Sequence, residues 1–120
     1  MANRIFKQRQ YLIGILDPAA SDAELSAFRS EFADQVGRHQ SRAALVDVGQ
    51  LDVIDSFTGR MLNELARVLL LRGALPMVVG IRPEVAFAMV SLGLALNGVA
   101  TAADLDAGLD LLDASEVVGR

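Results

Sequence analysis

The residues with the clearest chemical potential lie in one short stretch, where a hydroxyl follows two acids. Ser56 comes directly after Asp55 and shortly after Asp52. An apolar run at 43–48 precedes this stretch, and an apolar pattern of helical spacing follows it. A helix N-terminus has unpaired N–H groups and the positive end of the helix dipole. We therefore expect Ser56 to stand where a loop becomes a helix.

A serine at that position has two interpretations. Its oxygen can accept a hydrogen bond from the first turn, so Ser56 can be an N-cap residue and nothing more. Alternatively, Ser56 is a phosphorylation site. A phosphate adds about −1.5 to −2 charges, which a helix N-terminus can accept. Because Asp52 and Asp55 are close in sequence, the added charge would change the surface potential sharply and could act as a binding switch.

The acids give a third, enzymatic interpretation. Asp47, Asp52 and Asp55 could bind a cation or form an acid/base pair in a small α/β enzyme, although such acids are more often caps and solvated surface. Other catalytic patterns are missing. His39 is the one histidine and the chain has no cysteine, so Ser-His-Asp sets, thiolate sites and disulfides are excluded. No glycine-rich phosphate loop is present, and we expect no cofactor.

Composition narrows the class of protein. The chain has 120 residues, 52% of them hydrophobic, and a net charge of −4, which suits a domain with one packed core. No basic block points to nucleic acid. The start of the chain does not resemble a signal peptide. Residues 85–103 are uncharged, but polar and glycine residues interrupt them, so we expect no membrane span and a cytoplasmic protein.

Strand-like and helix-like segments alternate along the chain. Strands are expected at 10–16, 43–48, 75–79 and 99–101, with another short strand possible at 5–6. Helices are expected at 21–37, 56–72, 83–93 and 101–112. Their start and stop signals are a capping box at Ser21 and Glu24, Gly37, Gly73 and Pro83. In the helix after Ser56, the residues expected on the apolar face are Met61, Leu62, Leu65, Val68 and Leu69. The order predicts an α/β fold with a mixed, mostly parallel sheet and about four helices.

The pair Asp55-Ser56, together with Gly80-Ile81-Arg82-Pro83-Glu84 after the next strand, resembles the STAS family. Within that family the likeness is to RsbS-type antagonists of the bacterial stressosome. The segments that carry it are 53–57, 80–86, 91–96 and 101–109. The likeness implies a single STAS domain over residues 1–120, without an N-terminal sensor domain.

The resemblance implies a role in binding and not in catalysis. RsbS-type proteins co-assemble with RsbR-type STAS proteins into a large particle that sequesters an RsbT-type serine kinase. The kinase phosphorylates a serine at the start of the helix after the central strand, which corresponds to Ser56, and is then released. We expect partner contacts at the surrounding residues, namely Asp52, Asp55, Phe57, Thr58, Arg60 and Arg82. Arg82 is also the nearest candidate to stabilise a phosphate.

An alternative keeps the fold and changes the partner. The chain could be an anti-anti-sigma factor of the SpoIIAA type, which binds an anti-sigma kinase directly as a monomer or dimer. The size of the species formed with partners distinguishes it from the stressosome type.

Overall fold

The computed structural model describes residues 3–115. Its central feature is a five-stranded sheet in the order β1-β2-β3-β4-β5. The strands are β1 (Arg4–Gln8), β2 (Tyr11–Ile15), β3 (Ala43–Asp47), β4 (Leu75–Val79) and β5 (Ala100–Ala102). β1 pairs antiparallel with β2 through a tight hairpin, and the other pairs are parallel. The predicted α/β fold with a mixed, mostly parallel sheet is confirmed.

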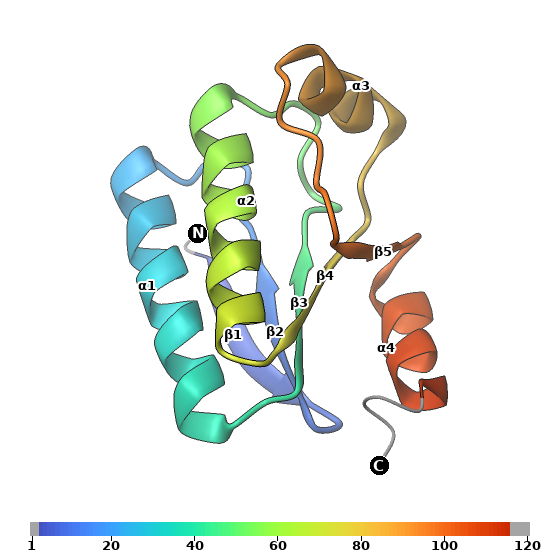
Figure 1. Cartoon of the computed structure of the whole chain (residues 1–120). Coiled ribbons are helices and arrows are strands. Elements are labelled where there is room, and N and C mark those ends of the chain that lie inside the picture. The colour runs from blue at the N-terminus through green and yellow to red at the C-terminus, as the bar shows by residue number, and fades with distance from the viewer. Residues whose placement is uncertain (1–2, 116–120) are drawn as a thin grey trace.

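The helices are α1 (Asp22–His39), α2 (Ser56–Leu71), α3 (Pro83–Ser91) and α4 (Leu105–Ala114). Figure 1 shows α1 and α2 side by side on one face of the sheet, α4 on the other face, and α3 at the end where α2 begins. Each parallel pair is joined by a crossover that contains a helix, as the alternating pattern predicts.

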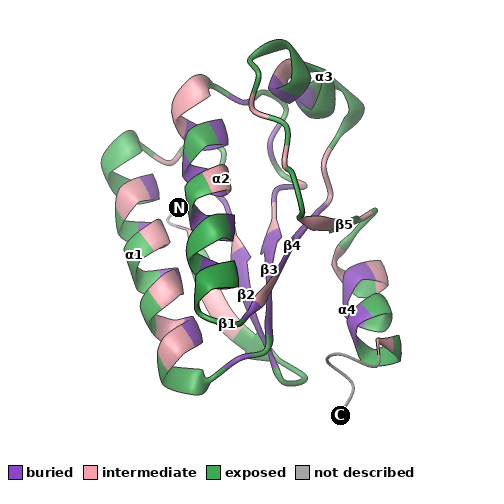
Figure 2. Cartoon of the chain, in the orientation of Figure 1, coloured by how far each residue is buried: buried purple, intermediate pink, exposed green. Residues whose placement is uncertain are grey.

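The central strand β3 is covered on both faces. Ala44 and Val46 belong to the core under α1 and α2, whereas Ala43 and Leu45 belong to the core under α4. Successive side chains of a strand point to opposite faces, so an uninterrupted apolar run is what a doubly covered strand requires. Figure 2 shows the burial concentrated along β2, β3 and β4.

The carboxyl end of α4 is tied to the β1–β2 hairpin. The Tyr11 hydroxyl donates to Asp113 at 2.8 Å. Arg9 donates to Asp110 at 3.2 Å and to Asp113 at 2.7 Å. The first of these bonds is partly buried and the others are exposed, so we expect the tyrosine bond to contribute most to holding the helix.

Three expected helix details are wrong. α1 does not stop at Gly37 but continues to His39, and Gln40 makes the left-handed turn at φ 50°. A Cβ atom at Gly37 would overlap the Arg72 guanidinium, which is the flexible end of a side chain and would have to move. The last helix does not start at Thr101, which lies in β5, but at Leu105, and Asp104 is its cap. Val68 is 37% exposed, so the buried face of α2 is narrower than expected.

Other signals are confirmed. Ser21 and Glu24 form the capping box, with bonds of 3.1 and 2.8 Å between each side chain and the other residue's backbone N–H. Pro83 occupies the first turn of α3, and Gly73 follows the end of α2 in the left-handed region. Among the described residues, the structure contains no helix with the length and apolarity needed to cross a membrane.

Candidate functional site

The candidate site is built where β3 and β4 end. Asp47 of β3 is opposite Val79 of β4 in the parallel register, so the loops that follow these strands leave the sheet at the same edge. The loops meet backbone to backbone at Gly49 and Gly80. Gly80 has φ 78°, and a Cβ atom on it would lie 3.0 Å from the Cα of Gly49. Both features favour glycine at this position.

Arg82 links the same two loops through its side chain. Its Nε donates to the Gly49 carbonyl at 3.0 Å, and its Nη1 donates to the Asp52 carboxylate at 2.9 Å. Both side chains of this ion pair are exposed, so the pair itself adds little stability. The pair matters for the geometry of the site. It brings the predicted site residues Asp52 and Arg82 together and holds the Asp52 loop next to α3.

Asp55, and not Ser56, caps α2. The Asp55 carboxylate accepts from the Thr58 N–H at 2.8 Å, and Asp55 has the extended backbone of an N-cap residue. The expectation that Ser56 is the cap is therefore wrong. Ser56 is the first residue of α2 and is partly exposed. Since Asp55 makes the capping bond, the Ser56 hydroxyl is not needed for it.

This assignment makes a stability prediction. Asp55→Ala is expected to lower the free energy of unfolding by about 1 kcal/mol, because the first turn of α2 loses its side-chain acceptor. Ser56→Ala is expected to change it by less than about 0.5 kcal/mol. Urea unfolding followed by circular dichroism measures both. A larger loss for Ser56→Ala than for Asp55→Ala would contradict the assignment.

The cap also gives a pH dependence of known sign. The hydrogen bonds from the Thr58 backbone and hydroxyl hold the pKa of Asp55 below its ordinary value of 3.8. A carboxyl whose pKa is lower in the folded chain stabilises it fully above the ordinary pKa, and loses that contribution as the pH falls through the lower value. The stability difference between the natural chain and Asp55→Ala should therefore be constant near neutral pH and shrink in strong acid.

The other predicted residues lie around Ser56 in different environments. Arg60 is exposed on the outer face of α2, and its charge also lowers the pKa of Asp55. Phe57 is half-buried and packs against the core. Thr58 is only 8% exposed, so it supports the cap from inside. Of the predicted residues around Ser56, those that a partner can reach are therefore mainly Asp52, Asp55 and Arg60.

Two apolar features at this end were not predicted. Val53 is 80% exposed between Asp52 and Asp55, and Phe87 on α3 is 76% exposed. A cavity of about 170 Å³ opens beside Asp55 and includes residues of the loop after β2, such as Leu16 and Pro18. The sequence contained a signal for the exposed Phe87. It is a large apolar residue that lies between the buried residues Val85 and Met89 and therefore falls outside the core-facing stripe of α3.

The three acids of the enzymatic interpretation do not form a cluster. Asp47 accepts from the Gly49 N–H at 2.8 Å, Asp52 pairs with Arg82, and Asp55 caps α2. Over residues 3–115, no group of three or more acidic, histidine or cysteine side chains is placed to hold a metal ion. The arrangement offers an accessible hydroxyl on a helix N-terminus, with charged and apolar groups around it, and suits recognition by a protein.

Solved structures similar to this chain include an RsbS variant of Moorella thermoacetica that carries a serine-to-glutamate substitution. Its TM-score is 0.83 at 30% identity, covering 91% of this chain and 92% of that one. A structure described as the molecular architecture of the stressosome, a signal integration and transduction hub, has a TM-score of 0.81 at 31% identity, covering 90% and 94%. The anti-sigma factor antagonist SpoIIAA in its unphosphorylated form has a TM-score of 0.73 at 10% identity, covering 95% and 100%, which is a likeness of fold alone.

A curated relative adds a partial match in sequence. The RsbT co-antagonist protein RsbRA of Bacillus subtilis (strain 168) is 32% identical over 74 residues, which is 62% of this chain. The chain spans 27% of the length of that relative. No protein-family model matches the chain.

Proposed function

Because the chain belongs to the STAS family and is similar to RsbS-type members, we propose that it is a non-catalytic component of a stressosome. In this proposal, residues 1–120 form a single STAS domain that assembles with an RsbR-type STAS protein in the cytoplasm. The assembly holds an RsbT-type serine kinase, and phosphorylation of Ser56 releases the kinase.

One observation supports the proposed role of Ser56 as a phosphorylation switch. The Ser56 hydroxyl stands on the first turn of α2 while Asp55 makes the capping bond. Phosphorylation would therefore remove no bond on which the helix depends. The phosphate would gain favourable contact with the N-terminal N–H groups of α2. The fold should persist in both states, which leaves the surface as the part that changes.

The charge that phosphorylation adds is large compared with the charge that the surface around Ser56 already carries. A phosphate adds about −1.5 to −2 charges beside Asp52 and Asp55. The cation at the loop contact, Arg82, already pairs with Asp52. A kinase docked over Val53 and its neighbours would have to cover this added negative charge, which the N–H groups of α2 and the exposed Arg60 offset only in part, and covering such charge at an interface costs affinity. Release on phosphorylation follows from that cost.

The assembly is tested by size. Mixed with a purified RsbR-type STAS protein, the chain should elute from gel filtration in a particle of roughly megadalton mass, as multi-angle light scattering would report. A partner preparation without this chain is the control for self-assembly. A mixture in which this chain elutes as a monomer or dimer would contradict the stressosome role and favour direct binding of an anti-sigma kinase in the SpoIIAA manner.

A further inference from the structure

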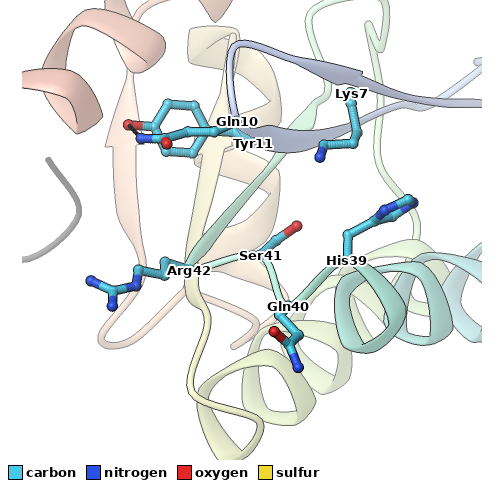
Figure 3. A pocket seen from close by; sticks show the side chains of 7 residues that line it. All are labelled: Lys7, Gln10, Tyr11, His39, Gln40, Ser41 and Arg42. Atoms are coloured by element: carbon cyan, nitrogen blue, oxygen red, sulfur yellow. Dashed lines mark hydrogen bonds between the residues drawn. The ribbon is translucent and has the colours of Figure 1, made fainter. Parts of the chain in front are cut away.

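A polar pocket lies at the end of the molecule opposite Ser56. It has a volume of about 290 Å³ and is formed by the β1–β2 hairpin and by the connection from α1 to β3. Figure 3 shows its side chains, among them Lys7 and Tyr11 from the hairpin and His39, Ser41 and Arg42 from the connection. Nothing in the proposed switch uses these residues.

The chemistry of the pocket differs from that of the whole chain. The chain has a net charge of −4, yet the pocket contains two cationic side chains, and none of the described residues that line it is acidic. In Figure 3 the Lys7 amine and the His39 ring lie on either side of the same space, whereas the Arg42 guanidinium points away from it. Lys7 is therefore the cation placed for direct contact.

Ser41 supplies the second, independent observation. The residue is 8% exposed, and its hydroxyl has no hydrogen-bond partner within residues 3–115. Figure 3 shows the hydroxyl directed into the space near Lys7 and His39. A buried polar group without a partner is costly and rare in folded proteins. The position of this hydroxyl thus indicates a binding partner supplied from outside residues 3–115.

The backbone keeps the Ser41 hydroxyl in this place. The Ser41 N–H donates to the Val36 carbonyl at 3.1 Å, and the neighbouring Gln40 holds the left-handed cap conformation of α1. On the other side, the Leu75 N–H donates to the Arg42 carbonyl at 2.7 Å. The connection is fixed at both ends, so the hydroxyl is presented by a rigid part of the fold.

We propose that this pocket binds a small oxyanion, the phosphate group of a low-molecular-weight phosphate ester. The Lys7 ammonium, the Ser41 hydroxyl and a ring N–H of His39 would donate to its oxygens, and charge-assisted bonds of this kind are the stronger ones. The pocket is at the small end of the range for ligand sites, which suits a phosphate with a small organic group. The carboxyl end of the α1 dipole opposes an anion, so moderate affinity is expected.

The proposal is tested with inorganic phosphate as the probe, independently of any kinase. In ¹H–¹⁵N spectra of the full chain, titration with sodium phosphate at constant ionic strength, balanced with sodium chloride, should shift the amide signals of Lys7, Ser41 and Arg42 and reach saturation. Lys7→Gln should weaken the affinity by about tenfold, since the charged donor is lost. The matched control, Arg67→Gln, removes one positive charge from the exposed face of α2 and should leave the affinity unchanged within about twofold.

The variant Ser41→Ala distinguishes a role of the Ser41 hydroxyl in phosphate binding from a role in the stability of the fold. Removing an unpartnered buried hydroxyl should leave the thermal midpoint of the phosphate-free chain unchanged or higher, while phosphate affinity falls. Shifts that grow linearly without saturation, or an affinity equally reduced in Arg67→Gln and Lys7→Gln, would show general charge screening and overturn the site. Undiminished phosphate affinity in both Lys7→Gln and Ser41→Ala would overturn it as well.

Discussion

Ser56→Asp is expected to lower the affinity of this chain for an RsbT-type serine kinase by at least about tenfold, whereas Ser56→Ala should retain the kinase. The aspartate places a carboxylate beside Asp52 and Asp55, and Arg82 is already paired with Asp52. Covering that carboxylate at an interface removes it from water, and Arg60 on the same helix offsets its charge only in part. The alanine adds no charge and leaves the cap made by Asp55 in place. Biolayer interferometry with immobilised kinase measures the difference.

The matched control for added charge is Ser30→Asp, which places the same carboxylate on the exposed surface of α1. It should bind the kinase like the natural chain. If Ser56→Asp and Ser30→Asp retain the kinase equally well, charge at Ser56 does not control release. If Ser56→Ala releases the kinase although circular dichroism shows a folded chain, the hydroxyl itself is part of the interface and the charge argument is wrong.

Gly80→Ala is expected to lower the free energy of unfolding by about 2–4 kcal/mol, the largest stability effect that we predict at the site. Two costs combine. Alanine must adopt φ 78°, and its Cβ would lie 3.0 Å from the Gly49 Cα and 3.1 Å from the Gly49 nitrogen and the Asp47 Oδ1. Because part of this contact is backbone, the loop cannot relieve it by a change of rotamer. Chemical denaturation of the purified variant measures the loss.

Gly98→Ala separates the two costs. Gly98 has φ 72°, but a Cβ atom there would meet nothing within 4 Å. This control should lose only about 1 kcal/mol, the cost of the backbone conformation. Equal losses for the two variants would mean that the contact between Gly49 and Gly80 does not hold the loops together, and that Arg82 is not positioned by it.

The alternation of strands and helices was predictable because its signals are local. Apolar runs at 43–48 and 75–79 indicated buried parallel strands, and the spacing between Ser21 and Glu24 indicated a capping box whose partners lie three residues apart. Such patterns depend on a few neighbouring residues, and so one sequence is enough to recognise them.

The cap of α2 was misassigned for a physical reason. Asp55 and Ser56 are adjacent, and both residue types are favoured N-caps. The choice between them depends on where the backbone turns from extended to helical, and the loop from Gly49 to Asp55 decides that by its contact with the Gly80 loop. Gly37 was misassigned similarly, because α1 continues past it to His39 and its close neighbour is the Arg72 side chain at the end of α2. Single-sequence patterns do not contain such long-range contacts.

The pocket of Lys7 and Ser41 could not be predicted at all. It is lined by residues of the β1–β2 hairpin and of the end of α1, and in the sequence these segments are separated by almost the whole of that helix. Neither segment has a recognised ligand motif. The exposed Phe87 did have a sequence signal, its position off the core stripe, but this became meaningful only when α3 was placed beside the start of α2 (Figure 1).

Intact-mass spectrometry after incubation with an RsbT-type kinase and ATP shows whether Ser56 is the residue that is phosphorylated, with Ser56→Ala treated in parallel. We expect one added phosphate on the natural chain and none on the variant, while both remain folded by circular dichroism. A phosphate that persists on Ser56→Ala would place the modified residue elsewhere. No phosphate on either chain, with a kinase active on an RsbS-type control substrate, would contradict the switch and leave Ser56 as an ordinary first-turn residue of α2.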